Sequence, residues 1–280
     1  MHKGFDLIER LIQQQHLRAE RVGEWVLQLL RSGQRFWHVW LWTSRAFIRM
    51  RWLARPAVMH VVIRQFYFTG VQGLLSIVLI AALVGGLAVY NIAAFARSVQ
   101  DLSLIGSLIN SLLVQEIAPL MVTLFLLLRS GIAVITEIGH MQIRHEDRYL
   151  HSLGISLYEY IYMPRVLASA LSGLILTFIF VLVSIWIGGL MLSWMYILNF
   201  NEFLLEVQRG TELQEVLAMF LKGMLYPMIA CVFLIDQGRT IGTDPNQVPV
   251  RVSSGVLGVV MLLMVLMVVT DVCWSWLWSL

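Results

Sequence analysis

The fold is decided by long stretches without charge, such as VLASALSGLILTFIFVLVSIWIGGLMLSWMY at residues 166–196. This stretch contains no Asp, Glu, Lys or Arg. A helix needs about 20 consecutive apolar residues to cross the hydrocarbon core of a membrane. The segment is therefore predicted to be a membrane-spanning helix.

Two further stretches share this property, one between Arg64 and Arg97 and one between Arg251 and Asp271. Of the 280 residues, 59% are hydrophobic and 13% are charged, whereas soluble domains carry roughly a quarter charged residues. This composition excludes a soluble monomer. We expect an all-α polytopic membrane protein with five transmembrane helices, over about 70–96, 104–135, 166–196, 216–236 and 252–273.

The N-terminal region, residues 1–64, has a different character. It carries eleven Lys and Arg against four Asp and Glu, and apolar residues recur at helical spacing from 7 to 42 with arginines between them. Such a pattern is typical of an amphipathic helix in the membrane interface. A helix that covers the protein's own core is the alternative. We therefore divide the chain into this interfacial region, 1–64, and a membrane domain over 65–280.

The distribution of charge also predicts a topology. Basic segments stay in the cytoplasm, which places the N-terminus there. Five spans then place the C-terminus on the far side, together with the acidic segment 199–215. By the same count the connection between the second and third spans is cytoplasmic.

Several classes of function are excluded. The chain has two lysines, Lys3 and Lys222, and neither completes a phosphate-binding loop of the G-x-x-x-x-G-K-[ST] type. The chain is therefore not an ATPase, and we predict no enzyme activity. The formal charge of +3 is too small to indicate a nucleic-acid partner. The three cytoplasmic histidines are not spaced as a helical metal pair, and we predict no metal site.

Charges inside the apolar segments are informative, because each is costly in a bilayer and usually faces a partner or a cavity. Glu116 lies in the second span, close to Pro119, and either lines a cavity or makes an interhelical bond. Lys222, Asp236 and Asp271 either pair with other spans or lie near the interfaces.

The cytoplasmic connection at 129–168 reads RSGIAVITEIGHMQIRHEDRYLHSLGISLYEYIYMPRVLA. Its small residues at the start permit close helix approach, and a helix of mixed charge is expected over about 137–154, where Gly154 can end it. A short helix between two spans is suited to transmit the movement of a soluble partner to these spans.

This segment resembles the MlaE/YrbE permeases, the membrane subunits of ABC transporters that work with MCE proteins on lipids. The family pattern contains G-R-x-G-(x)-A-x-x-x-E-[IL]-G-x-M, then E-Q-I-D-A-L-x-x-M-G and P-R-x-x-A, and the likeness extends over about 60–280. Two departures stand out: Gln115 replaces a basic residue before the family glutamate, and residues 146–151 read EDRYLH. The matching residues in the segment are Arg129, Gly131, Ala133, Glu137, Ile138, Gly139, Met141, Glu146, Leu150, Gly154, Pro164, Arg165 and Ala168.

The resemblance implies a permease subunit in the bacterial inner membrane that moves phospholipids between this membrane and a periplasmic MCE protein. A separate cytoplasmic ABC ATPase would bind ATP and Mg²⁺, and this chain would bind no cofactor itself. Two permease chains, identical or related, would form the core. Import of sterol or fatty-acid-like lipids is an alternative, and an ion-coupled transporter or a non-transporting scaffold is an alternative of another class.

The resemblance also implies roles for particular residues. Polar groups for the lipid cavity are expected at Tyr90, Asn91, Gln115 and Glu116. The ATPase is expected to act on a coupling helix, through Glu137, Met141, Arg144, Glu146, Asp147, Leu150, Leu153 and Gly154. Packing or ion pairs are expected at Gly85, Gly86, Arg129, Gly131, Pro164 and Arg165, and an Arg129–Glu137 ion pair is an alternative role for these two residues.

Overall fold

The computed structural model describes residues 56–101, 104–195, 199–242 and 245–278, together with Leu41 and Arg45. All the secondary structure in this part of the chain is helical. The interfacial helix predicted over 7–42 lies outside the described residues, except for Leu41.

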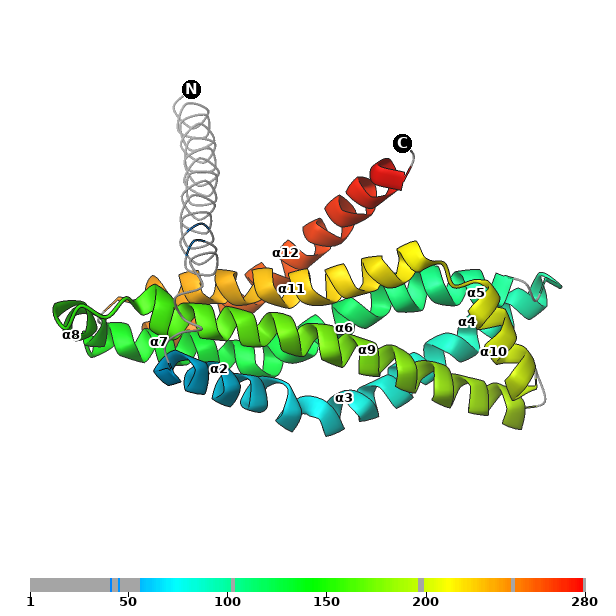
Figure 1. The fold of residues 1–280 in the computed structure, drawn as a ribbon, viewed down its shortest axis with the longest axis horizontal. Coiled ribbons are helices and arrows are strands. Elements are labelled where there is room, and N and C mark those ends of the chain that lie inside the picture. Colours follow the sequence, from blue (N-terminus) through cyan, green and yellow to red (C-terminus); the bar gives the residue numbers. More distant parts are fainter. Residues whose placement is uncertain are drawn as a thin grey trace, which may run out of the picture.

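The first two membrane segments are built from consecutive helical pieces (Figure 1). The first segment bends where α2 gives way to a short 3-10 turn next to Gly70. The second contains two π-helical stretches, and such stretches are frequent at functional sites. The pieces of the first are α2 (Pro56–Thr69), η1 (Val71–Gly73), α3 (Leu74–Ile80), η2 (Ala81–Gly85) and α4 (Gly86–Ser98). Those of the second are α5 (Leu104–Leu108), η3 (Ile109–Ile117), α6 (Ala118–Leu126), η4 (Leu127–Gly131) and α7 (Ile132–Ile143).

The remaining elements alternate short surface helices with long ones. A short helix, α8 (Glu146–Ser152), follows α7, and η5 (Tyr158–Tyr162) leads into the long α9 (Met163–Trp194). The amphipathic α10 (Phe200–Arg209) then precedes α11 (Leu213–Arg239) and α12 (Gln247–Trp278). Because α8 and α10 lie at opposite ends of the elongated bundle (Figure 1), we call these the α8 end and the α10 end.

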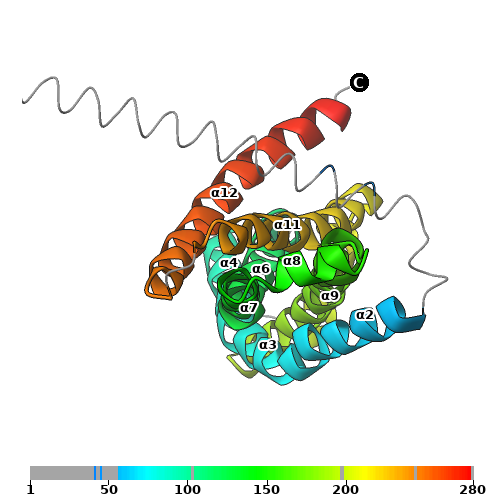
Figure 2. The ribbon, with the colours of Figure 1, turned by 90° about the vertical axis from the view of Figure 1, so that its left-hand side faces the viewer.

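The centre of the bundle is the contact between α9 and α11. A Cβ atom at Gly173 would lie 2.4 Å from Pro227 Cγ and 2.5 Å from the Gly223 carbonyl oxygen. Only glycine therefore allows the two backbones to approach this closely, as small residues do between membrane helices. The end view shows α2, α3 and α7 beside this pair, with α12 on the outside (Figure 2).

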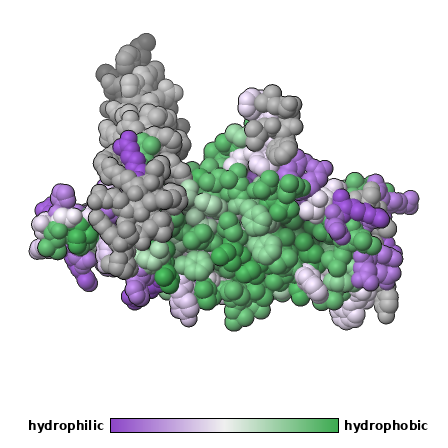
Figure 3. All heavy atoms as spheres, in the orientation of Figure 1, coloured by the Kyte–Doolittle hydropathy of each residue, from purple (hydrophilic) through white to green (hydrophobic). Residues whose placement is uncertain are grey.

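A broad apolar belt separates two polar ends on the visible face (Figure 3). Within the described residues, five helices are long and apolar enough to cross a membrane. They are Val58–Ser98, Leu104–Ile143, Tyr158–Trp194, Leu213–Arg239 and Gln247–Trp276. This confirms five spans in an all-α fold. The helices extend beyond most of the predicted limits, because their end turns carry polar residues that a hydropathy pattern leaves out.

The start of the bundle also lies earlier than expected. The helix α2 runs without interruption through positions 64 and 65, where the sequence suggested a domain boundary, and it packs on α9. Residues from Pro56 onward are therefore part of the bundle.

Candidate functional site: an intramembrane charge cluster and the α8 end

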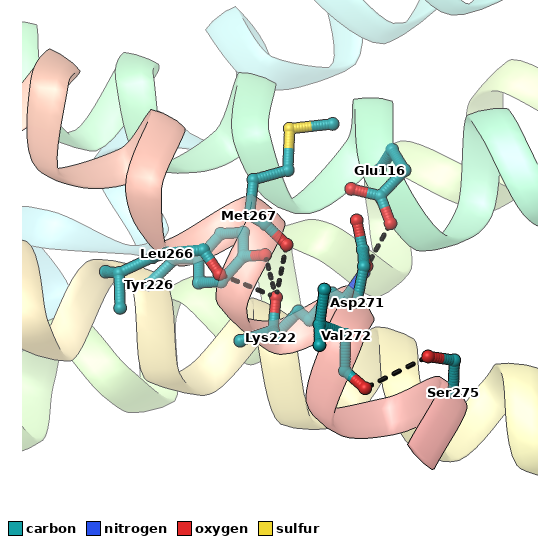
Figure 4. A network of polar contacts seen from close by, with 9 residues as sticks. Glu116, Lys222, Tyr226, Leu266, Met267, Asp271, Val272 and Ser275 are labelled. Carbon is teal, nitrogen blue, oxygen red and sulfur yellow. Dashed lines mark hydrogen bonds and ion pairs between the residues drawn. The ribbon is translucent and has the colours of Figure 1, made fainter. Parts of the chain in front are cut away.

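Three charged side chains from three spans meet inside the apolar part of the bundle (Figure 4). The Lys222 ammonium donates hydrogen bonds to both the Glu116 and the Asp271 carboxylates. Lys222 lies nine residues after the start of α11, which is roughly 14 Å along the helix axis at 1.5 Å per residue. We call Glu116, Lys222 and Asp271 the charge cluster.

Local sequence explains how the cluster is positioned. Glu116 lies in the π-helical η3, just before Pro119. Proline has no N–H with which to continue the ladder of helical hydrogen bonds, and the wider turn before it presents Glu116 toward α11. Next to the cluster, Tyr226 and Thr270 share a hydrogen bond of 2.8 Å between their hydroxyl groups, which also joins α11 to α12.

The three members differ in exposure. The side chain of Lys222 is 4% exposed, that of Glu116 16% and that of Asp271 45%. The Oε2 atom of Glu116 is buried and has no hydrogen-bond partner among the described residues. Two carboxyl groups thus share one ammonium, and the cluster opens to the surroundings at Asp271.

Only one of the four predicted cavity residues belongs to this cluster. Tyr90 packs against the apolar core, and the Asn91 amide donates to the Leu87 carbonyl of its own helix at 2.8 Å. Gln115 interacts with Glu215 at the start of α11. Lys222 and Asp271 were predicted to pair between spans or to lie near the interfaces, and the first reading is confirmed for both. Nothing in the sequence paired them with Glu116, because the three are far apart along the chain.

At the α8 end, the single helix predicted over about 137–154 is wrong. The helix α7 ends at Ile143, and His145 has a left-handed backbone with φ of 57° before α8 begins. Gly154 then has φ of +72° and follows the end of α8, as the sequence suggested. Two left-handed residues therefore bound α8 and set its direction independently of α7.

The expected coupling residues divide between these two helices. Glu137 and Met141 lie in α7, whereas Glu146, Asp147 and Leu150 lie in α8. Arg144, between the helices, lies 3.8 Å from Glu146. No residue of α8 is buried, and the exposed fractions are 69% for Tyr149 and 72% for Leu153 just beyond it.

The alternative ion pair between Arg129 and Glu137 is also wrong. Glu137 pairs with Arg165 at the start of α9. Arg129 instead donates to the Thr69 carbonyl at 3.3 Å and lies over the Phe68 ring. Both contacts tie neighbouring spans together, because one joins α7 to α9 and the other joins η4 to α2.

The remaining predicted residues lie at close helix contacts. An added Cβ atom at Gly85 would lie 1.8 Å from Ser184 Oγ. At Gly86 it would lie 3.2 Å from Ile187 Cγ2, and at Gly131 it would lie 2.6 Å from Leu234 Cδ1. Pro164 is buried in the first turn of α9 and directly follows the π-helical η5.

The chain is similar to known permeases. The family described as Permease MlaE matches residues 62–273. A probable ABC transporter permease protein from Rickettsia typhi is 23% identical over 88% of this chain and 93% of its own length. A probable ABC transporter permease protein from Synechocystis is 31% identical over 49% of this chain and 52% of its own length. The chain therefore spans about half the length of this relative. The intermembrane phospholipid transport system permease protein MlaE of Haemophilus influenzae is 28% identical over 46% of this chain and 49% of its own length.

Proposed function

Because the chain belongs to the MlaE permease family, we propose that it is the membrane subunit of an ABC transporter that moves phospholipids between the inner membrane and a periplasmic MCE protein. A separate cytoplasmic ATPase supplies the energy. The observation that carries the cargo assignment is the charge cluster of Glu116, Lys222 and Asp271 within an otherwise apolar bundle. Acyl chains need apolar walls, and a headgroup needs a few placed polar groups.

The composition of the cluster favours a headgroup that contains an ammonium. The one cation, Lys222, already donates to both carboxylates, and it is almost fully shielded. The oxygen of Glu116 without a partner and the half-exposed Asp271 are acceptors. A buried acceptor without a donor is unfavourable, and an ethanolamine ammonium provides such a donor.

We place the α8 end in the cytoplasm, which puts the N-terminus there and the C-terminus in the periplasm. The helix α8 is the contact for the ATPase, because it buries none of its own residues and exposes apolar side chains in a polar region of the molecule. Two such permease chains, identical or related, form the transmembrane core.

The first experiment is purification of the chain from its native membrane in mild detergent, followed by mass spectrometry of bound proteins and lipids. An ABC ATPase, an MCE protein and phosphatidylethanolamine are expected. Bound sterol or fatty acid in place of phospholipid would support the alternative cargo. Purification of the chain without an ATPase from several mild detergents would contradict the ABC transporter and favour an ion-coupled transporter or a scaffold.

The second experiment tests the role of the cluster in cargo binding. Asp271→Asn removes the most exposed carboxylate but leaves the pair of Lys222 and Glu116 intact. We expect a several-fold lower yield of phosphatidylethanolamine relative to phosphatidylglycerol. Arg209→Gln is the control, since it removes an exposed ion pair with Glu206 at the α10 end. An unchanged lipid ratio in Asp271→Asn would exclude the cluster as the headgroup site.

A further inference from the structure

A cavity of about 280 Å³ lies at the α8 end, between α7, α8, η5 and the end of α11. A cavity needs only roughly 10–15 Å³ of such space to hold one water molecule. The cavity at the α8 end is slightly smaller than the roughly 300–1,000 Å³ of pockets for drug-sized ligands. The volume therefore suits one long side chain or a group of similar size.

The lining of the cavity includes two carboxyl groups, one guanidinium and two tyrosine rings. Asp147 enters it from α8 and Asp236 from α11, and Asp236 is itself 3% exposed. The Arg239 guanidinium lies 5.5 Å and 5.8 Å from the ring centroids of Tyr158 and Tyr162, which is within the range of a cation–π contact.

One atom in this lining lacks a partner. The Oδ1 atom of Asp147 is shielded from solvent and has no hydrogen bond among the described residues. A shielded carboxylate oxygen is unfavourable unless a donor reaches it. An arginine guanidinium is the strongest such donor in proteins, since it carries a charge and binds carboxylates through two parallel N–H groups.

The position of the cavity indicates where the donor comes from. Asp147 and the exposed Tyr149 are two residues apart on the same short helix. Residues two apart on a helix point to nearly opposite sides, so a protein that packs on the exposed side of α8 lies about one helix diameter, roughly 10 Å, from the cavity. The cavity lies away from the charge cluster, which is built from other parts of α11 and from η3 and α12.

We propose that this cavity receives an arginine side chain of the ATPase subunit, held by Asp147 beneath α8. This inference rests on the proposed function, because it requires an ATPase that docks on α8. Such an insertion joins the ATPase to α7, α8, η5 and α11 together, so that movement of the ATPase is passed to the third and fourth spans as well as to α8.

The test measures the Kd of the co-purified ATPase for the detergent-solubilised permease. Asp147→Asn keeps the shape of the side chain and removes its charge, and Thr240→Arg places the permease's own guanidinium in the cavity wall. We expect each variant to weaken binding about tenfold or more, since loss of one partner of a shielded charge pair has effects of this size. Glu202→Gln, at the α10 end, is the charge-matched control with an unchanged Kd. Thermal melting of each variant in detergent shows whether the permease remains folded.

Arginines on the ATPase are then replaced by glutamine one at a time. For one arginine, its replacement and Asp147→Asn together should weaken the Kd less than the two separate effects added, because both changes remove the same contact. Normal affinity in both permease variants, or additivity for every arginine, would overturn the proposed insertion. Failure of the unmodified permease to bind any ATPase would instead contradict the proposed function.

Discussion

Lys222 holds two carboxylates from different spans within the mainly apolar interior of the bundle. Lys222 therefore neutralises carboxylate charge whose burial would otherwise be costly. Removal of one member of a buried ion network is strongly destabilising, whereas neutral replacement of all members is often tolerated.

For Lys222→Met we expect a loss of about 3–5 kcal/mol of stability, seen as a lower melting temperature of the purified protein in detergent. The matched variant also carries Glu116→Gln and Asp271→Asn, which leaves no unpaired carboxylate. This triple variant should recover most of the loss. Equal melting temperatures for Lys222→Met and the unmodified protein would show that the carboxylates do not depend on the ammonium.

Gly85 offers a second prediction for a single residue. Its missing side chain leaves space for Ser184 on α9, whose Cβ would lie 2.4 Å from an added methyl group. Gly85→Ala should therefore cost about 1–3 kcal/mol through overpacking. The neighbouring Gly86→Ala is the control and should cost less, because its nearest contact, Ile187 Cγ2, lies at 3.2 Å. Addition of Ser184→Gly to Gly85→Ala should restore the melting temperature. If it does not, the two helices are not limited by this contact.

At the scale of a helix, α8 is a separate unit with its own start and end. The exposed Tyr149, and Leu153 just beyond the helix, lie outside the five spans. Exposed apolar side chains in a polar region indicate a surface that binds a partner.

The double variant Tyr149→Ser and Leu153→Ser should weaken ATPase binding at least tenfold, because aromatic and apolar anchors carry much of the energy of an interface. The measurement is the Kd in detergent, and the melting temperature of the permease should not change. Leu213→Ser removes a leucine that is 76% exposed at the α10 end and should leave the Kd as it is. Equal effects of the two sets of changes would exclude α8 as the specific contact.

The sequence predicted some of these elements better than others. Three of the five spans follow from runs without charge, and the other two from apolar segments with few charges, since the cost of charge in a bilayer allows few alternatives. The break at His145 was missed, because a histidine with left-handed backbone has no clear signal in the sequence. The joining of Glu116, Lys222 and Asp271 was missed for a different reason. It depends on which faces of three helices meet, and periodicity alone does not determine this.

At the scale of the whole molecule, α12 is the least enclosed span. Only 11% of its most apolar stretch is buried, compared with 61% for α11. It lies on the outside of the bundle, and its C-terminal part points away from the other helices (Figures 1 and 2). Its polar connections to the bundle include Asp271 and Thr270.

The two natural cysteines report on this difference. Cys231 in α11 is buried, whereas Cys273 near the end of α12 is exposed. A small uncharged maleimide should therefore label one thiol per folded chain in detergent, and both after denaturation. Peptide mass spectrometry should locate the first label at Cys273. Rapid labelling of Cys231 in the folded protein would contradict the enclosure of α11 in the bundle.

The left-handed residues at both ends of α8 have a consequence for how such proteins diversify. Because α8 buries no residue of its own, its sequence can change while the bundle keeps its packing. Residues 146–153 can therefore be exchanged as a unit. An exchange of this segment between two related permeases should change which ATPase each one binds, while each keeps its own cargo.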